Sequence, residues 1–222
     1  MYHRYADRRA AGRALGEILA SHPFRAKVVV VGLPRGGVPV GYEVAKMLKA
    51  PLDFLVARKI GAPTHGELAC GAFIVGGEVV WNSRVMRSLG LTSDDLEPAH
   101  QQELKEAQQR ESILRTPETS AVSFKGASVL LVDDGLATGA TMKAAVKGAL
   151  AREAAEVIVA VPVGPVSTCR EIEAMDVPLV CEQRVDEESF SSVGQWYRDF
   201  SQVTTEECKE LLLKNRSELS LT

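Results

Sequence analysis

Two adjacent carboxylates, Asp133 and Asp134, stand between the apolar run 129–132 and a short loop rich in glycine and threonine, residues 135–141. The apolar run predicts a strand that is buried on both faces, and a good helix former follows the loop. Backbone N–H groups at such a loop point outward together, and the helix dipole favours a negative charge there. The loop is therefore a candidate phosphate site. The acid pair beside it could accept hydrogen bonds from sugar hydroxyls or reach a divalent cation.

A second glycine loop, residues 33–37 (Leu-Pro-Arg-Gly-Gly), follows the apolar run 27–32 and precedes a predicted helix at 38–49. Two glycines let a backbone approach a ligand closely, and Arg35 supplies a cation. Another apolar run at 52–57 follows, and two strands joined by such a helix form a right-handed parallel crossover. Taken alone, each loop could be an ordinary turn, and this one lacks the G-x-G-x-x-G spacing of a dinucleotide site.

Together, the two loops resemble those of the type I phosphoribosyltransferases. The string Val-Leu-Leu-Val-Asp-Asp-Gly-Leu-Ala-Thr-Gly-Ala-Thr at 129–141 is similar to that family's phosphoribosyl pyrophosphate motif, and residues 33–37 are similar to its pyrophosphate loop. The resemblance implies an α/β fold with a Rossmann-like core, in which helices flank a mostly parallel central sheet. It implies a single domain over residues 1–222. It also implies a cis peptide bond, not before proline, at Pro34–Arg35.

The resemblance further assigns a role to each part of the two loops. Asp133 and Asp134 would hold the ribose hydroxyls and contact a Mg²⁺ cofactor, mostly indirectly through the substrate. The residues expected to bind the 5′-phosphate are Gly135, Leu136, Ala137, Thr138, Gly139, Ala140 and Thr141. The residues expected to bind pyrophosphate are Pro34, Arg35, Gly36, Gly37, Arg58 and Lys59. The expected catalytic residues are Asp133, Asp134, Arg35 and Lys59.

Residues 58–69 are polar, contain glycine and proline, and lie between strand-like runs. They could be a plain surface loop. In the family this place holds a mobile loop that closes over the site, which makes Arg58 and Lys59 the main candidates there and His65 and Glu67 weaker ones. A hairpin with a Gly-Gly turn is predicted over 72–81.

Two further segments are predicted as additions to the core. Residues 82–117 form a helical insertion, which could help build a dimer, cover the mobile loop, or be a solvated helix without a role. Residues 183–203, with the N-terminal segment, resemble the hood that covers the base in purine transferases. A C-terminal segment that only packs on the core is the alternative. The expected base-binding residues are Val163, Phe190, Val193 and Trp196.

The implied activity transfers a 5-phosphoribosyl group from phosphoribosyl pyrophosphate to a nucleobase-like nitrogen in purine or pyrimidine salvage and releases pyrophosphate. Ala137 stands where the 6-oxopurine enzymes carry an aspartate, and the run 161–164 offers no cation. The Arg-Gly-Gly loop differs from that of the adenine enzymes, so the sequence names no base. The alternatives are a regulatory protein that binds phosphoribosyl pyrophosphate or nucleotides without turnover, and a structural α/β protein with chance glycine loops.

The composition limits the partners. The chain has 222 residues, 45% of them hydrophobic, and a net charge of −3, which argues against nucleic acid as a partner. No apolar run reaches membrane-spanning length, and the N-terminus is too charged for a secretory signal. The four cysteines form no C-x-x-C pair, which is typical of free thiols in a reducing compartment. The composition therefore predicts a cytoplasmic protein, and the resemblance implies a homodimer that binds phosphoribosyl pyrophosphate and a nucleobase.

Overall fold

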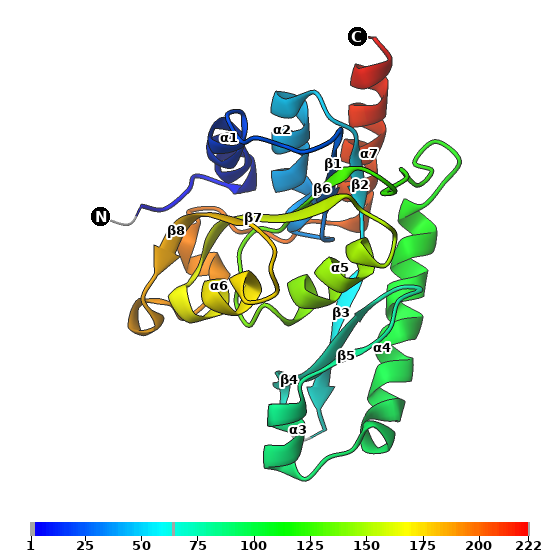
Figure 1. The fold of residues 1–222 in the computed structure, drawn as a ribbon, viewed down its shortest axis with the longest axis vertical. Coiled ribbons are helices and arrows are strands. Elements are labelled where there is room, and N and C mark those ends of the chain that lie inside the picture. The colour runs from blue at the N-terminus through cyan, green and yellow to red at the C-terminus, as the bar shows by residue number, and fades with distance from the viewer. Residues whose placement is uncertain (1–2, 64, 222) are drawn as a thin grey trace.

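The computed structural model describes residues 3–63 and 65–221, without the side chains of residues 65–67. Its centre is a five-stranded sheet in the order β2-β1-β6-β7-β8, in which every pair of neighbouring strands is parallel (Figure 1). The α/β fold class predicted from the sequence is thus confirmed. The strands are β1 (Val28–Gly32), β2 (Leu52–Phe54), β6 (Ser128–Val132), β7 (Glu156–Pro165) and β8 (Leu179–Val185).

Helices cover both faces of this sheet, as Figure 1 shows. One face carries α1 (Arg8–Leu19), α2 (Gly37–Leu48) and α7 (Thr205–Ser220), and the other carries α5 (Ala140–Leu150) and α6 (Val166–Glu173). Strand β1 shows why its apolar run is continuous. Val30 packs into the apolar cluster on the side of α1, α2 and α7, while Val29 and Val31 pack into the cluster on the side of α5 and α6. Side chains alternate between the two faces of a strand, so both faces of β1 need apolar residues.

A second, antiparallel sheet lies beside the first and is built from β3 (Ala57–Ala62), β4 (His65–Ile74) and β5 (Val80–Trp81). The predicted hairpin is present, and Gly76 has a φ of 74° in its turn. Residues 58–69, in contrast, are not the expected loop, because most of them belong to β3 and β4. Glycine and proline suggested a loop, but the shifts of register around Gly61 accommodate that glycine within the pairing, and Pro63 lies in the turn between β3 and β4. The side chains of His65 and Glu67 lie outside the described part of the chain.

The predicted helical insertion consists of α3 (Ser83–Leu89) and α4 (Ser93–Leu114). Thr92 and Asp95 form a capping box at the start of α4. Figure 1 shows α4 running along the antiparallel sheet, and it packs against β3 and α7. Its buried side chains are those of Leu96, Ala107 and Leu114. The mostly polar helix therefore packs on the second sheet along one side, and most of its other side chains are exposed or half-buried.

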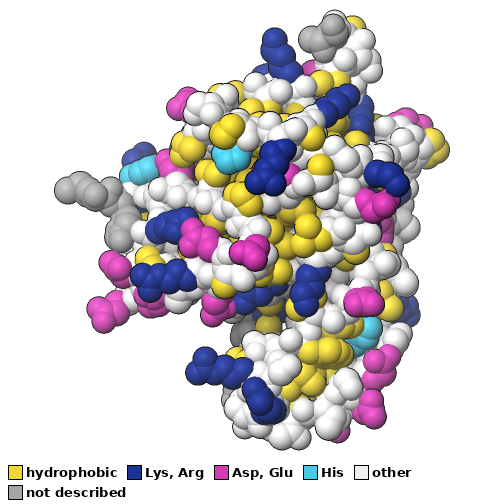
Figure 2. All heavy atoms as spheres, viewed as in Figure 1, with side chains coloured by type: hydrophobic (Ala, Val, Ile, Leu, Met, Phe, Trp, Pro, Cys, Tyr) yellow, Lys and Arg dark blue, Asp and Glu magenta, His cyan; other side chains and the backbone are white. Residues whose placement is uncertain are grey.

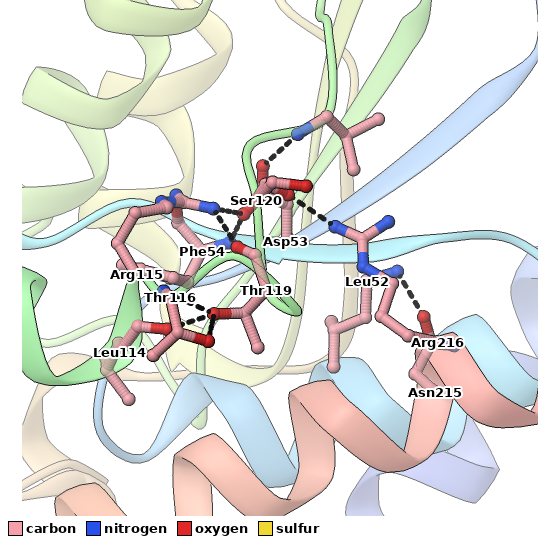
Figure 3. A network of polar contacts seen from close by, with 11 residues as sticks. Leu52, Asp53, Phe54, Leu114, Arg115, Thr116, Thr119, Ser120, Asn215 and Arg216 are labelled. Atoms are coloured by element: carbon pink, nitrogen blue, oxygen red, sulfur yellow. Dashed lines mark hydrogen bonds and ion pairs between the residues drawn. The ribbon is translucent and has the colours of Figure 1, made fainter.

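A buried polar network holds the segment after α4 against β2 and α7 (Figure 3). Asp53, 2% exposed, accepts hydrogen bonds from the Arg115 guanidinium at 2.6 Å and from the backbone N–H of Val122 at 2.8 Å. Arg216 of α7 donates to the carbonyl of Ser120 at 3.0 Å. The network fixes the C-terminal end of the insertion to the core.

The hood joins the N-terminal segment to residues 183–203. After β8 come two short 3-10 helices, η1 (Glu187–Ser189) and η2 (Val193–Trp196). Tyr5 forms a bridge with Tyr197, since its N–H donates to the Trp196 carbonyl and its own carbonyl accepts from the Arg198 N–H, both at 2.8 Å. A small apolar core lies beneath and contains Tyr5, Ala11, Val163, Val185, Trp196 and Tyr197.

On the face drawn in Figure 2, basic and acidic side chains of the described residues are interspersed. That distribution agrees with the small net charge of −3 and differs from the broad basic surfaces typical of nucleic-acid binding. Within the described residues, no helix has both the length and the apolar character needed to cross a bilayer.

Candidate active site

The two glycine loops meet at the carboxyl ends of β1 and β6, which are parallel neighbours. The N–H of Leu33 donates to the carbonyl of Val132 at 2.9 Å. A methyl group on Gly36 would lie 1.9 Å from Oδ2 of Asp134, and one on Gly37 would lie 2.5 Å from the Val132 carbonyl oxygen. Only residues without a β-carbon let the loop approach the acid pair so closely. The structure thus places the two loops together.

The Pro34–Arg35 peptide bond is cis, as the resemblance implied. The N–H of Gly37 donates to the Leu33 carbonyl at 2.9 Å and closes the turn. Cys208, near the start of α7, donates its S–H to the Arg35 carbonyl at 3.5 Å. Burial raises the pKa of the Cys208 thiol to about 12, so it remains a neutral donor. The hydrogen bond from Cys208 therefore links the pyrophosphate loop to α7.

The acid pair has an ionic partner that sequence reasoning missed. Nε of Arg8 lies 2.7 Å from Oδ2 of Asp134, and the two side chains are 12% and 15% exposed. The Arg8 guanidinium also lies 3.8 Å from the ring centre of Phe200 and donates to the Ser201 carbonyl at 2.8 Å. Because Arg8 precedes Asp134 by 126 residues, no local signal in the sequence links them.

The two carboxylates differ in their surroundings. Asp133 accepts from the Asp134 N–H at 2.8 Å, and its pKa is raised well above the usual range, first by burial and then by the charge of Asp134. Burial also raises the pKa of Asp134, but its ion pair with Arg8 opposes this shift. Asp133 is therefore the carboxylate with less compensation for its charge, and a ligand that brings hydroxyl donors or a cation would stabilise it.

The loop from Gly135 to Thr141 forms a cradle at the start of α5. Gly139 has a φ of 69° and precedes the first helical residue, and no side chain caps the helix there. The first N–H groups of α5 are thus available to an anion. A cavity of about 250 Å³ is lined by this loop together with Asp133 and Lys59. Lys59 reaches the cradle from β3, and the structure therefore brings it to the predicted phosphate site.

Arg58, the neighbour of Lys59 on β3, was expected to bind pyrophosphate, but its side chain pairs with α4. Its Nε donates to Glu103 at 2.6 Å, and its Nη2 lies 2.7 Å from Glu106. Both glutamates belong to α4. Successive side chains of a strand point to opposite faces, so Lys59 turns to the cradle while Arg58 turns to the insertion. In this structure Arg58 ties α4 to β3 and does not face the pyrophosphate loop.

The four residues expected to bind a base separate into two groups. Val163 is fully buried and Trp196 is 6% exposed, both within the small core under the hood. The expectation that these two side chains contact a base is therefore corrected. Both are buried in the small core, where removing their apolar surface from water stabilises the fold. Val193 is half-buried and lies against Gly135, where a β-carbon would be 2.7 Å from its Cγ1. Phe190 is half-buried and lines a larger cavity.

That larger cavity measures about 670 Å³ and also borders the phosphate loop. Ala137, Thr138 and Ala140 line both cavities. Trp81 of β5 and Phe190 of the hood add aromatic surface, and serine, threonine and asparagine side chains add polar groups. A cavity of this size and lining suits a small organic ligand.

Among the described residues, no group of three or more His, Cys, Asp and Glu side chains could hold a metal ion. Asp133 and Asp134 offer carboxylate oxygens beside the cradle. Mg²⁺ commonly binds through one or two carboxylates and substrate phosphates. The donor set therefore fits a cation that arrives with a phosphorylated ligand, and the cofactor remains a prediction.

Comparisons with known proteins place these features in context. A family model described as a phosphoribosyl transferase domain matches residues 75–197, which include the acid pair, the phosphate loop and most of the hood. A Mycobacterium tuberculosis (strain H37Rv) protein named "Putative phosphoribosyl transferase Rv0571c" is 42% identical over 203 residues, which is 91% of this chain and 45% of that protein. The chain thus spans about half the length of the curated relatives it matches.

Two solved structures are similar along nearly the whole chain. The crystal structure of TT1426 from Thermus thermophilus has a TM-score of 0.79 and 37% identity, and the match covers 95% of this chain and 98% of that one. A hypothetical protein from Neisseria gonorrhoeae with bound ppGpp has a TM-score of 0.52 and 14% identity, with 96% and 94% covered. The second likeness concerns the fold alone.

Proposed function

Because the chain belongs to the phosphoribosyl transferase family and has its type I fold, we propose that it transfers a 5-phosphoribosyl group from phosphoribosyl pyrophosphate to a nitrogen acceptor. One observation carries the proposal. The pyrophosphate loop packs directly against the acid pair, with Gly36 in contact with Asp134. A ribose gripped by the acids would therefore have its diphosphate on the glycine loop and its 5′-phosphate in the cradle.

The proposed reaction forms a bond from the acceptor nitrogen to the anomeric carbon while the bond from that carbon to the diphosphate oxygen breaks. The diphosphate leaves with the bonding electrons, and the acceptor nitrogen loses its proton. Since the sugar gains positive charge as the leaving group gains negative charge, the protein contributes placement and charge stabilisation. Asp133 and Asp134 would orient the ribose through its hydroxyls, and Arg35 and Lys59 would balance the phosphates.

Mg²⁺ is proposed as the cofactor at the acid pair. The adjacent carboxylates of Asp133 and Asp134 beside the phosphate loop support this assignment, because Mg²⁺ commonly binds through one or two carboxylates and substrate phosphates. When bound, the ion would neutralise part of the diphosphate charge. The acids would hold it mostly through the oxygens of the substrate.

The acceptor would lie under the hood, where Phe190 and Val193 are half-buried and offer apolar contact to a flat ring. We propose a nitrogen heterocycle of the nucleobase class and a role in salvage. A cytoplasmic location is supported by the four free cysteines. A homodimer is proposed from the family resemblance.

The test is a panel of nucleobases incubated with phosphoribosyl pyrophosphate and Mg²⁺, with released pyrophosphate as the readout. The matched control is the double variant Asp133→Asn with Asp134→Asn, which should release none. Binding of phosphoribosyl pyrophosphate without turnover of any base would favour a regulatory protein. A calorimetric titration that detects no binding of phosphoribosyl pyrophosphate would refute the proposal.

A further inference from the structure

Arg110, on α4, is half-buried and has no ion-pair partner among the residues that the structure describes. Among the described residues, its side chain makes no hydrogen bond or ion pair, and the same is true of the side chain of Arg35. Burial lowers the pKa of Arg110, and the nearby charges of Arg58 and Arg35 lower it further. Two further arginines, from β3 and from the pyrophosphate loop, thus lie within electrostatic range of Arg110.

The packing of α4 directs Arg110 toward the pyrophosphate loop. Ala107 and Leu114, on the same side of the helix, are fully buried in the apolar cluster that includes Cys208 of α7. Cys208 in turn contacts the Arg35 carbonyl at 3.5 Å. Arg35 and Arg110 both act electrostatically on the Cys208 thiol, so both lie near this one side chain.

The carboxylates of α4 leave Arg110 uncompensated. Glu106 lies within electrostatic range of Arg110, but Glu103 and Glu106 both pair with Arg58. A half-buried cation without a hydrogen-bond partner is unfavourable, and a second cation beside it adds repulsion. Sites that bind charged ligands often retain such arrangements. An anion with several oxygens would satisfy both guanidinium groups, because the planar fork of arginine matches phosphate.

We propose that Arg110, from the helical insertion, binds the diphosphate of the sugar donor together with Arg35. This inference rests on the proposed function, since it adds a residue to the same site. It gives the insertion a role that its polar sequence did not indicate. The ion pairs of Arg58 with Glu103 and Glu106 then hold α4 against β3, which keeps Arg110 beside the loop.

The test compares Arg110→Gln with the matched control Lys105→Gln, which removes an exposed cation from the same helix. Pyrophosphate and ribose 5-phosphate are titrated separately by calorimetry in the presence of Mg²⁺. Arg110→Gln should weaken pyrophosphate binding by about 10- to 100-fold, the range for a lost hydrogen bond to a charged group. Binding of ribose 5-phosphate should stay within about twofold, and Lys105→Gln should change neither.

A second variant, Arg110→Lys, keeps the charge and loses the planar fork, so its pyrophosphate affinity should be intermediate. The melting temperature of unliganded Arg110→Gln should equal or exceed that of the wild type, because an unpaired cation is removed. Unchanged pyrophosphate affinity in Arg110→Gln, or equal weakening of both ligands, would overturn the inference. If the wild type binds neither ligand, the proposed function itself fails, which is a different result.

Discussion

Replacing Asp133 with asparagine should stabilise the unliganded protein while it removes activity. The folded state raises the pKa of Asp133, chiefly through burial and then through Asp134. The folded protein therefore binds this proton more tightly than the unfolded chain, in which the pKa is about 3.9. It follows that the carboxylate lowers the stability as the pH rises from about 4 through the folded-state pKa. A neutral side chain removes that penalty at neutral pH.

The direction of the gain follows from the raised pKa of Asp133. For a chain this long, about 1 kcal/mol of added stability raises the melting temperature by roughly 2–4 °C. Asparagine keeps the oxygen that accepts from the Asp134 N–H at 2.8 Å, so the charge is the main change. We expect Asp133→Asn to melt at a higher temperature than the wild type at neutral pH, and the difference should shrink as the pH is lowered toward about 4.

The assay is thermal unfolding of wild type and variant across this pH range, with and without phosphoribosyl pyrophosphate. Stabilisation by the ligand should be lost in Asp133→Asn, and kcat/KM should fall about a hundredfold or more, which is about 2.7 kcal/mol. Asp134→Asn is the matched control. It should gain less stability, because it leaves Arg8 without its carboxylate. A lower melting temperature for Asp133→Asn at neutral pH would refute the electrostatic reasoning.

Three further changes test other parts of the molecule. Gly36→Ala should cost about 1–3 kcal/mol of stability and most of the activity, measured by urea unfolding and pyrophosphate release, because its methyl group would lie 1.9 Å from Asp134. Asp53→Ala should lower the free energy of unfolding by about 3–5 kcal/mol, since it leaves the Arg115 guanidinium without its buried partner. Arg35→Ala should weaken inhibition by pyrophosphate more than it weakens binding of ribose 5-phosphate, as competition assays would measure.

Each of these changes has a control or a contrary outcome. Gly41→Ala, where the nearest atom to a new methyl group is 3.2 Å away, should have a much smaller effect than Gly36→Ala. A loss below about 1 kcal/mol in Asp53→Ala would mean that the network is not a tie between the insertion and the core. Equal loss of both ligands in Arg35→Ala would argue against a pyrophosphate role.

The sequence predicted the parts of the site that are local. Residues 33–37 and 129–141 each combine a strand, a turn and a helix start within a few positions, and parallel strands place such turns at one edge of the sheet. The β3–β4 ribbon was missed because the bulge around Gly61 depends on cross-strand pairing, which no single segment encodes.

Contacts between distant segments explain the other differences. Arg8 reaches Asp134 because the N-terminal segment pairs with the hood. Trp196 enters the small core because Tyr5 and Val163 are there to cover it. Arg58 turns to α4 because the insertion covers that face of β3. Each case depends on a contact between segments that are far apart in the sequence, and such contacts cannot be inferred from periodicity or composition.

The bridge between Tyr5 and Tyr197 has a consequence for biosynthesis. Arg8 donates to Ser201, which is 193 residues further along the chain. At translation rates of about 5–20 residues per second, roughly 10–40 s separate the appearance of these two residues. Until then Arg8 lacks its hydrogen bond to Ser201, so the hood is completed only after both glycine loops have been synthesised.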